Sequence, residues 1–359
     1  MHDGVKMHPS AVLLVSDGQC AGIVDVVPAG AQVRALPHGI LAPGLVDLQV
    51  NGGGGVMFND APTPATLRTM ITAHRSLGTS AMLPTLITDT PDVTHAAIAA
   101  GIAMPDLLGL HLEGPHLSVV RKGAHAAALI RTMTEDDLIT LCVAAQKLRN
   151  LMVTVAAETV SPDQIARLTA AGVIVSLGHS NADFDTCAAA FAAGARCTTH
   201  LYNAMSGLGH RAPGLVGATL DGAGAAGLIA DGIHVHPAAL RAAVRAKVHG
   251  ALFLVSDAMA VAGTDQNAFT LNGRHIKRQS GRLTLADGTL AGADLSLPQA
   301  IALMVNNGGV TPEVAIAMAT SAPATVLRRP GHAGHLIAGQ TCDVVHLSPD
   351  LKTANILKL

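Results

Sequence analysis

Hydrophobic and polar positions repeat one unit through most of the chain: a short apolar strand, a polar or glycine-rich tip, and then a helical stretch. Continuous apolar strands that alternate with helices are typical of a parallel sheet that helices cover on both faces. Eight such strands predict an α/β fold of the (β/α)8 TIM-like barrel type. The predicted strands are residues 45–50, 80–86, 107–113, 151–158, 173–179, 197–202, 227–234 and 251–257.

The two chain ends carry a different pattern, in which short alternating or apolar runs are separated by turn signals such as Asp-Gly and Pro-Ala-Gly. Such runs predict small antiparallel strands, which cannot form a core alone. We therefore predict that residues 1–41 and 335–359 meet in a small β-sandwich domain built from both chain ends, beside a barrel of residues 42–334. The predicted terminal strands are residues 11–15, 22–27, 32–36, 343–347 and 355–359.

One segment interrupts the alternation of strands and helices after the eighth predicted strand. Residues 265–290 contain Asn272-Gly273 and Asp287-Gly288, dipeptides that favour tight hairpin turns. We therefore expect a hairpin insertion. Because it follows the C-terminal tip of a barrel strand, it can lie over a site at that end of the barrel.

Composition narrows the possible partners. The 359 residues are 49% hydrophobic and 13% charged, which is far from the composition of disordered proteins and allows a large core. The formal net charge is −2 and no lysine- or arginine-rich run occurs, so we expect no nucleic-acid or membrane partner. Five cysteines without a Cys-x-x-Cys pair, and the absence of a typical signal segment, predict a cytoplasmic protein.

Polar side chains gather at the C-terminal ends of the predicted barrel strands, where the functional groups of such barrels lie. His111 and Glu113 share one face of the third strand, because side chains alternate along a strand. A single acid or histidine at a tip can equally be a hydrogen-bonded structural residue, whereas several that converge favour a functional set. These polar residues are Asp47, Gln49, Asn51, Thr85, Thr88, His111, Glu113, Glu158, His179, His200, Asn203, Asp231, His234 and Asp257.

Three of the tip residues, Glu113, His179 and His200, have the donor types of a catalytic zinc site. Such a site takes three protein ligands and leaves a position for water. Asp257 ends the eighth strand and can take a proton from a water that the metal activates. The alternative for Asp257 is a helix cap or a turn aspartate.

The polar tips lie within longer motifs, which follow one another in a definite order. They are Pro-Gly-Leu-Val-Asp-Leu-Gln-Val-Asn-Gly at 43–52, Leu-Pro-Thr-Leu-Ile-Thr at 83–88, Gly-Leu-His-Leu-Glu-Gly-Pro at 109–115, Lys-Gly-Ala-His at 122–125, Ser-Leu-Gly-His-Ser-Asn-Ala at 176–182, Thr-His-Leu-Tyr-Asn-Ala-Met at 199–205, Arg-Ala-Pro-Gly at 211–214, Ala-Asp-Gly-Ile-His-Val at 230–235 and Val-Ser-Asp-Ala at 255–258. Nearly end to end, the chain resembles the N-acetylglucosamine-6-phosphate deacetylases of the amidohydrolase superfamily.

The resemblance implies hydrolysis of the acetamide of N-acetyl-D-glucosamine 6-phosphate to glucosamine 6-phosphate and acetate, in amino-sugar catabolism and cell-wall sugar recycling. By motif position, Glu113, His179 and His200 correspond to the ligands of one divalent metal per chain, which we expect to be zinc (Zn2+). Asp257 corresponds to the general base that later protonates the leaving amine, and His125 to the histidine that polarises the amide carbonyl. A homodimer is also implied. The implied substrate-binding residues are Ala124, His125, Asn203, Ala204, Arg211, Asp231, His234, Leu290, Ala291 and Gly292.

Two positions depart from the pattern. Many amidohydrolases hold a second metal with His-x-His on the first strand, where this chain has Gln49-Val50-Asn51, so we predict a single tightly bound metal. His116 stands where the family often has an aromatic or other apolar residue, and we expect a surface substitution rather than a change at the mouth of the site. His111 lies deeper than Glu113, and we expect it to be a core histidine that orients a ligand.

Two other functions fit the same sequence. The substrate can be another N-acetylated sugar phosphate, such as the galactosamine epimer, since epimers differ in one hydroxyl and the sequence does not locate its contact. The barrel can also be a non-catalytic sugar-phosphate-binding protein. The presence of ligands, base and phosphate-binding residues together argues against this last function.

Overall fold

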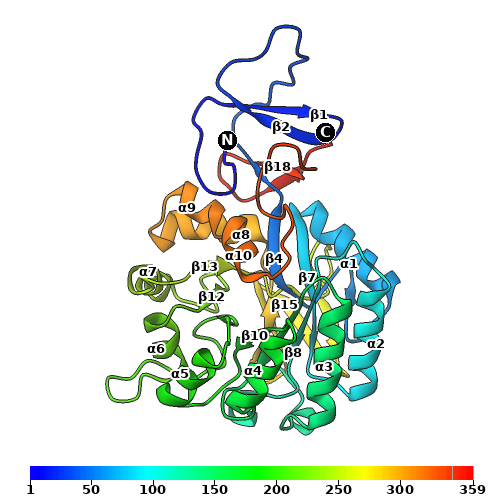
Figure 1. Ribbon diagram of the computed structural model, residues 1–359, viewed down its shortest axis with the longest axis vertical. Helices are drawn as coiled ribbons and strands as arrows, with labels where there is room; N and C mark the ends of the chain where they lie inside the picture. Colours follow the sequence, from blue (N-terminus) through cyan, green and yellow to red (C-terminus); the bar gives the residue numbers. More distant parts are fainter. Residues whose placement is uncertain (342, 359) are drawn as a thin grey trace.

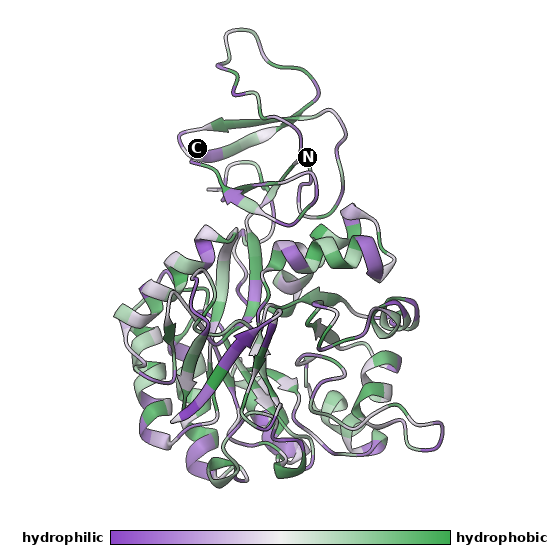
Figure 2. Cartoon of the chain, turned by 180° about the vertical axis from the view of Figure 1, so that it is seen from behind, coloured by the Kyte–Doolittle hydropathy of each residue, from purple (hydrophilic) through white to green (hydrophobic). Residues whose placement is uncertain are grey.

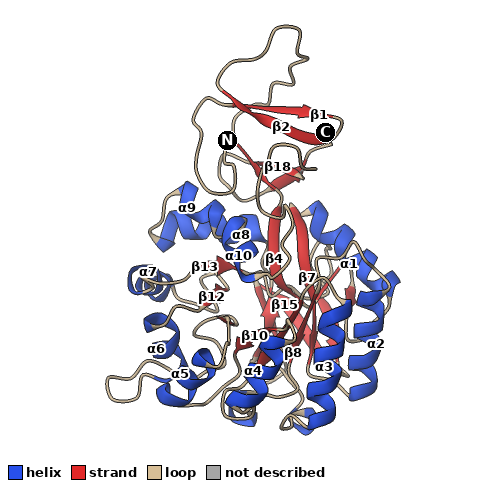
Figure 3. Cartoon of the chain, in the orientation of Figure 1, coloured by secondary structure: helices blue, strands red, loops and turns tan. Residues whose placement is uncertain are grey.

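The computed structural model describes residues 1–341 and 343–358 (Figure 1). Eight strands form one parallel sheet in the order β13-β12-β11-β10-β9-β8-β7-β4, and helices surround it (Figure 3). The predicted (β/α)8 barrel is thereby confirmed. Its strands are β4 (Leu45–Val50), β7 (Thr79–Ile87), β8 (Leu110–Glu113), β9 (Leu151–Val155), β10 (Ile174–Leu177), β11 (Cys197–Thr198), β12 (Ala225–Leu228) and β13 (Leu252–Leu254).

The outer helices begin where the sequence supplies capping side chains. The hydroxyl of Thr134 accepts the backbone N–H of Asp137, whose carboxylate accepts the N–H of Thr134, and Ser161 and Gln164 form the same capping box. The helices are α1 (Pro64–Ser76), α2 (Pro91–Ile102), α3 (Glu135–Lys147), α4 (Pro162–Ala170), α5 (Phe184–Ala192), α6 (Gly214–Asp221), α7 (Pro237–Ala246), α8 (Leu297–Leu303), α9 (Pro312–Ala317) and α10 (Ser321–Val326), with short helical turns at Val119–Arg121, Ala127–Leu129 and Met304–Gly308.

Several barrel strands end earlier than the apolar pattern predicts. The strand predicted at 197–202 stops at Thr198, and the one predicted at 173–179 stops at Leu177. The next residues include His179 and His200, whose φ angles of 47° and 29° are incompatible with a strand. The chain therefore leaves the sheet just before it presents these side chains.

Both chain ends lie together at one end of the molecule (Figure 1). β1 (Val12–Ser16) pairs with β2 (Gln19–Val24), and β3 (Ile40–Pro43) pairs antiparallel with β18 (Val344–Leu347), which also pairs with β19 (Ala354–Ile356). The strand predicted at 32–36 is wrong: this segment is an irregular and largely exposed loop, and it pairs with none of the strands in the described residues. Cys342, and the last residue of the strand predicted at 355–359, lie outside the described residues.

The insertion after the eighth strand is larger than the predicted hairpin. It is a four-stranded antiparallel sheet of β14 (Ala268–Leu271), β15 (Arg274–Gln279), β16 (Arg282–Thr284) and β17 (Leu290–Ala293). Leu271, Ile276 and Leu283 are buried in an apolar cluster that includes Met259, so the sheet packs on the segment that follows β13. A short two-stranded pair, β5 (Gly52–Gly53) and β6 (Val56–Met57), follows β4.

The main apolar core lies between the barrel strands and the surrounding helices. Figure 2 shows this distribution, with hydrophobic residues along the barrel strands and mixed hydropathy on the outer helices. Within residues 1–341 and 343–358, no helix combines the length and the hydrophobicity that a membrane crossing requires.

Candidate active site

A cavity of about 250 Å³ opens at the C-terminal ends of the barrel strands. We call it the C-terminal cavity. Its wall combines residues that follow six different barrel strands with residues of the inserted sheet, so it forms only when the barrel closes. Its lining includes Asn51, Ile87, Glu113, Gly123, Ala124, His125, His179, His200, Asn203, Ala204, His234, Asp257, Met259, Leu271, Thr289, Leu290 and Gly292.

Glu113, His179 and His200 converge at the floor of this cavity. Oε1 of Glu113 lies 3.0 Å from Nε2 of His200 and 3.3 Å from Nε2 of His179, and the two Nε2 atoms are 3.1 Å apart. All three side chains are at least 94% buried. One carboxylate and two imidazoles at such separations can hold a divalent cation, as the sequence predicts.

The hydrogen bonds around the two histidines fit a metal. Nδ1 of His179 donates to the carbonyl oxygen of Arg121 at 2.7 Å, which leaves the lone pair of Nε2 directed at the cluster. Among the described residues, two buried side-chain atoms lack a hydrogen-bond partner, Nδ1 of His200 and Oδ1 of Asn51. Both belong to this cavity, which indicates that its polar groups are completed by something other than the chain itself.

Asp257 lies beside the cluster and is held by amide side chains. Its Oδ1 accepts from Nδ2 of Asn51 at 2.7 Å and from Nε2 of Gln49 at 3.2 Å. The same Nε2 of Gln49 donates to Oε1 of Glu113 at 3.1 Å, so one amide joins the two carboxylates. Burial and the negative charge of Glu113 raise the pKa of Asp257 to about 6, which suits a group that gains and loses a proton near neutral pH.

Glu113 and Asp257 differ in their protonation. Burial by itself raises the pKa of Glu113, but the adjacent imidazole groups of His179 and His200 outweigh it and bring the pKa well below its ordinary value. One carboxylate is therefore a permanent anion suited to a metal ligand, whereas the other can exchange a proton. Two acids with separated pKa values are a common feature of hydrolytic sites.

His125 faces the cluster from the loop that follows β8. Nδ1 accepts the backbone N–H of Thr88 at 3.3 Å and lies 2.8 Å from the hydroxyl of the same residue. Burial and the neighbouring His179 lower the pKa of His125 to about 3, so the imidazole is neutral. Because Nδ1 is an acceptor, the single proton lies on Nε2, which is 3.8 Å from Oε2 of Glu113. A neutral donor there can polarise a carbonyl group.

His234 forms a pair with Asp231. Oδ2 of Asp231 lies 2.6 Å from Nδ1 of His234, and its Oδ1 accepts the backbone N–H groups of residues 233 and 234. Burial raises the pKa of Asp231, but the hydrogen bond with His234 outweighs it, so the pKa is lowered. His234, Asn203 and Ala204 line the cavity, whereas Asp231 lies behind His234 and orients it.

The other residues that the family resemblance implies for substrate binding lie in three different environments. Ala124, Leu290 and Gly292 line the cavity, and Ala291 is buried in the apolar cluster behind them. Arg211 is exposed on the loop at 206–213 and is not part of the cavity wall. Motif position therefore implied, for substrate binding, some residues that line the cavity and others that do not.

Gly292 shows why this wall needs a glycine. Its φ angle is 64°, and a Cβ there would lie 2.4 Å from Cγ of Met259 and 2.9 Å from the carbonyl oxygen of Asp257. Both the conformation and the contact exclude a larger side chain. The inserted sheet can thus approach the Asp257 segment closely.

Unusual backbone conformations concentrate at this cavity. His179, His200, Ala204 and Asp257 all have positive φ angles, between 29° and 50°. Such conformations cost about 1 kcal/mol or more for each non-glycine residue and persist only where the surroundings enforce them. The strand ends are therefore strained in order to aim these side chains.

His111 is the core histidine that the sequence predicts. It is 1% exposed, Nδ1 donates to the carbonyl oxygen of Leu48 at 3.1 Å, and Nε2 accepts from the hydroxyl of Thr154 at 2.7 Å. Burial lowers its pKa to about 4, so it is neutral. Thr154 in turn bonds Thr199, the residue before His200. His111 thus supports a ligand through two hydroxyl groups.

His116 is not the surface residue that we expected. It is 2% exposed, and Nδ1 donates to the carbonyl oxygen of Arg131 at 3.2 Å, while the N–H of Arg131 donates to the carbonyl oxygen of Pro115 at 3.1 Å. These bonds join the two ends of the loop that carries His125. A polar ring can replace an apolar one here because a backbone carbonyl accepts its proton.

Sequence reasoning missed one contact of the His125 loop. Arg274, at the start of β15, donates to the carbonyl oxygen of Ala124 and connects the inserted sheet to that loop. Nothing in the sequence around Arg274 distinguishes it from the other arginines of the chain. Only its position in the folded sheet brings it to the loop.

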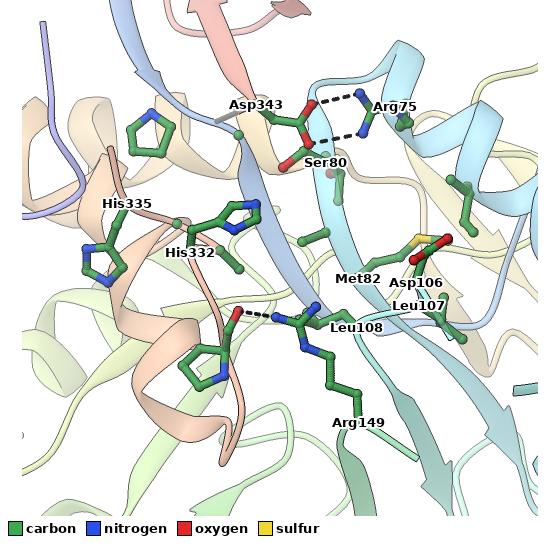
Figure 4. Close-up of a pocket in the computed structure, with 18 of the residues that line it drawn as sticks. Arg75, Ser80, Met82, Asp106, Leu107, Leu108, Arg149, His332, His335 and Asp343 are labelled. Atoms are coloured by element: carbon green, nitrogen blue, oxygen red, sulfur yellow. Dashed lines mark hydrogen bonds and ion pairs between the residues drawn. The ribbon is translucent and has the colours of Figure 1, made fainter. Parts of the chain in front are cut away.

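A larger cavity, of about 460 Å³, lies at the N-terminal ends of the strands (Figure 4). We call it the N-terminal cavity. Arg75 forms a bidentate ion pair with Asp343, and Arg149 donates to the carbonyl oxygens of Arg329 and Pro330. The guanidinium groups of Arg75 and Arg149 therefore join the barrel to the C-terminal segment.

Comparison with known proteins agrees with this geometry. An N-acetylgalactosamine-6-phosphate deacetylase of Shewanella sp. (strain ANA-3) is 43% identical over 347 residues, which are 94% of this chain and 87% of the relative. The N-acetylglucosamine-6-phosphate deacetylase of Homo sapiens is 37% identical over 330 residues, 87% of this chain and 80% of the relative. The crystal structure of N-acetylglucosamine-6-phosphate deacetylase from Pasteurella multocida superposes with a TM-score of 0.91 at 33% identity, covering 97% of this chain and 92% of that one.

The sequence profile of the amidohydrolase family matches residues 40–358, which span β3, the whole barrel, the inserted sheet and β19. This range includes all three residues of the Glu/His/His cluster, and the family is metal-dependent. The chain is a hydrolase that belongs to the amidohydrolase family.

Proposed function

We propose that this chain hydrolyses the acetamide of N-acetyl-D-glucosamine 6-phosphate, releasing acetate and glucosamine 6-phosphate, in amino-sugar catabolism. The observation that carries the proposal is the convergence of Glu113, His179 and His200 with Asp257 and His125 in one cavity. An amide is a poor electrophile with a poor leaving group, so its hydrolysis needs an activated water, a polarised carbonyl and a proton for the nitrogen. These residues offer one group for each need.

Glu113, His179 and His200 would hold one divalent cation, and we propose zinc because one carboxylate and two imidazoles are ligands that zinc favours. When bound, such a cation lowers the pKa of water and polarises a carbonyl oxygen. Gln49 and Asn51 support a single metal, because their amide N–H groups already donate to Asp257 and Glu113, where a second cation would need free lone pairs.

Asp257 transfers a proton from the attacking water to the leaving nitrogen. Its carboxylate takes a proton from the attacking water, and the new C–O bond forms as His125 donates from Nε2 to the carbonyl oxygen. Asp257 then gives the proton to the leaving nitrogen as the C–N bond breaks, which yields acetic acid and the amine. The acid passes its remaining proton to the amine or to solvent, which leaves acetate. The raised pKa of Asp257, about 6, suits both directions of this transfer.

His234, held by Asp231, together with Asn203, Ala204 and Arg211, would bind the sugar phosphate. Arginine offers a bidentate match to phosphate oxygens, and a histidine paired with a carboxylate is a good donor when protonated. We further propose a cytoplasmic homodimer. In support of a reducing compartment, Cys20, Cys142, Cys187 and Cys197 are free thiols.

A second candidate substrate is the galactosamine epimer, N-acetyl-D-galactosamine 6-phosphate. It is favoured by the 43% identity to the Shewanella relative that bears this name, against 37% for the human relative named after the glucosamine substrate. The two sugars differ at one hydroxyl, so a single hydrogen bond in the cavity decides between them.

Acetate release from both sugar phosphates and from unphosphorylated N-acetylglucosamine, with zinc added, tests the proposal. We expect release from a 6-phosphate, with the ratio of the two kcat/KM values identifying the physiological epimer. No acetate from either phosphate at any added divalent metal would refute the function. Metal analysis of protein purified without chelators should give one equivalent per chain, and two required equivalents would contradict the single site.

A further inference from the structure

The first and last strands of the barrel meet without a regular hydrogen-bonded ladder. Among the described residues, β4 and β13 form the two ends of the sheet order, with one isolated bridge between Val50 and Ala258. Lower in the barrel, the N–H groups of Val46 and Leu254 donate to the carbonyl oxygens of Ala319 and Met318 instead of to each other's strand. The seam between β4 and β13 is therefore held by separate contacts.

Asp47 fills the middle of this seam. Its carboxylate is 0% exposed, and Oδ1 accepts the backbone N–H of Gln49 at 3.1 Å. The backbone N–H of Ser256 lies 3.3 Å from Oδ1 and 3.2 Å from Oδ2, so the carboxylate connects the first strand to the segment after the eighth. None of the ion pairs among the described residues includes Asp47. A carboxylate buried without a cation is costly and is rare as mere core filling.

The two N–H groups that Asp47 holds belong to functional parts of the chain. Ser256 immediately precedes Asp257, whose φ of 49° is enforced rather than intrinsic. Gln49 is the residue whose side chain joins Asp257 to Glu113. The N–H of Asp257 also donates to the carbonyl oxygen of Gln49 at 3.1 Å, so the two segments that Asp47 holds are also joined directly.

We propose that Asp47 is a positioning residue, which fixes the seam between β4 and the Ser256-Asp257 segment and thereby holds the Asp257 carboxylate against the metal-binding cluster. Asp47 is not part of the wall of the C-terminal cavity. Its action goes through the backbone of Gln49 and Ser256. This inference rests on the proposed function only where acetate release is its readout.

Asp47→Asn tests the proposal with almost no change in volume. One acceptor oxygen remains, but the new NH2 group faces the N–H of Ser256 and repels it. We expect kcat to fall roughly 10- to 100-fold, as for other small misplacements of a reacting group, with KM changed less than about 3-fold and the metal content unchanged. Asp47→Ala, which removes both acceptors, should lower kcat further wherever it folds.

Thr219→Val is the matched control. It removes a buried hydrogen bond of 2.7 Å between Thr219 of α6 and Thr198 of β11, a strand that β12 and β13 separate from the seam. We expect Thr219→Val to lose about as much thermal stability as Asp47→Asn does and to keep the kcat of the wild type. A kcat for Asp47→Asn within about 3-fold of wild type, or equal kcat losses in both variants, would overturn the proposal.

A crystal structure of Asp47→Asn gives a readout that does not depend on activity. We expect the Asp257 backbone to leave the left-handed region and its carboxylate to leave Gln49 and Asn51. An unchanged Asp257 would overturn the inference, whatever the substrate. By contrast, wild-type protein that releases no acetate refutes the proposed function and leaves this structural test of Asp47 intact.

Discussion

The two ends of the barrel hold cavities of opposite character. The N-terminal cavity is the larger, at about 460 Å³ against 250 Å³, yet its arginines pair with Asp343 or with backbone carbonyls. The C-terminal cavity has strained backbone, two buried polar atoms without partners and an acid with a raised pKa. Unsatisfied and strained groups, rather than volume, distinguish a reactive site from a gap between packed elements.

The largest effect that should separate the two cavities comes from Asp257→Asn. The amide cannot accept the proton of water, so we expect kcat to fall about 10²- to 10⁴-fold, the usual contribution of general acid–base catalysis. Metal content should stay unchanged because Asp257 is not one of the three ligands. Asp265→Asn, which changes an exposed acid after the same strand, is the control. Activity within 10-fold of wild type would exclude Asp257 as the base.

Arg211→Ala should have the next largest effect. If the exposed loop at 206–213 reaches the phosphate, the loss of a bidentate donor should raise KM for the 6-phosphate roughly 10-fold or more, and KM for the unphosphorylated sugar very little. The comparison matters because Arg211 lies outside the wall of the C-terminal cavity. Arg245→Ala, an exposed arginine in the last turn of α7, controls for net charge. Equal losses on both sugars would remove Arg211 from the phosphate site.

The third effect is the pH dependence that the C-terminal cavity should impart. Because the base must be ionised and the pKa of Asp257 is raised to about 6, kcat should be constant above that pH and fall up to 10-fold per unit below it. The substrate phosphate also titrates near pH 6, but its protonation should alter KM. Metal content measured at each pH separates this profile from metal loss. A kcat that stays constant down to pH 5, with the metal retained, would contradict this role.

The repeated strand and helix pattern was sufficient to predict the barrel, because every strand buries both faces and each is followed by a helix. The metal cluster could also be predicted, since donor residues at three strand ends must converge when a barrel closes. The local backbone conformation at the strand ends could not be predicted. The positive φ angles of His179 and His200 end their strands early, and no apolar pattern records them.

Other failures arose where a position depends on tertiary partners. The run at 32–36 has strand-like composition but pairs with none of the described strands, and it is an exposed loop. His116 was expected on the surface because histidine is polar, yet the carbonyl oxygen of Arg131 satisfies it inside. Arg274 reaches the loop of His125 only because the four-stranded insertion folds over the site. Each case depends on a contact between segments far apart in sequence.

The smallest effect should come from the N-terminal cavity, through Arg75→Ala. The variant breaks the bidentate ion pair with Asp343, in which both side chains are 41% exposed. Solvent screens such a pair, so we expect a loss of at most about 1 kcal/mol in the free energy of unfolding, measured by chemical denaturation. Both kcat and KM should be unchanged, because the pair lies at the opposite ends of the strands from the metal cluster. A change in kcat of more than about 2-fold at unchanged metal content would show that the N-terminal cavity is coupled to catalysis. The contrast between a structural and a reactive end of the barrel would then fail.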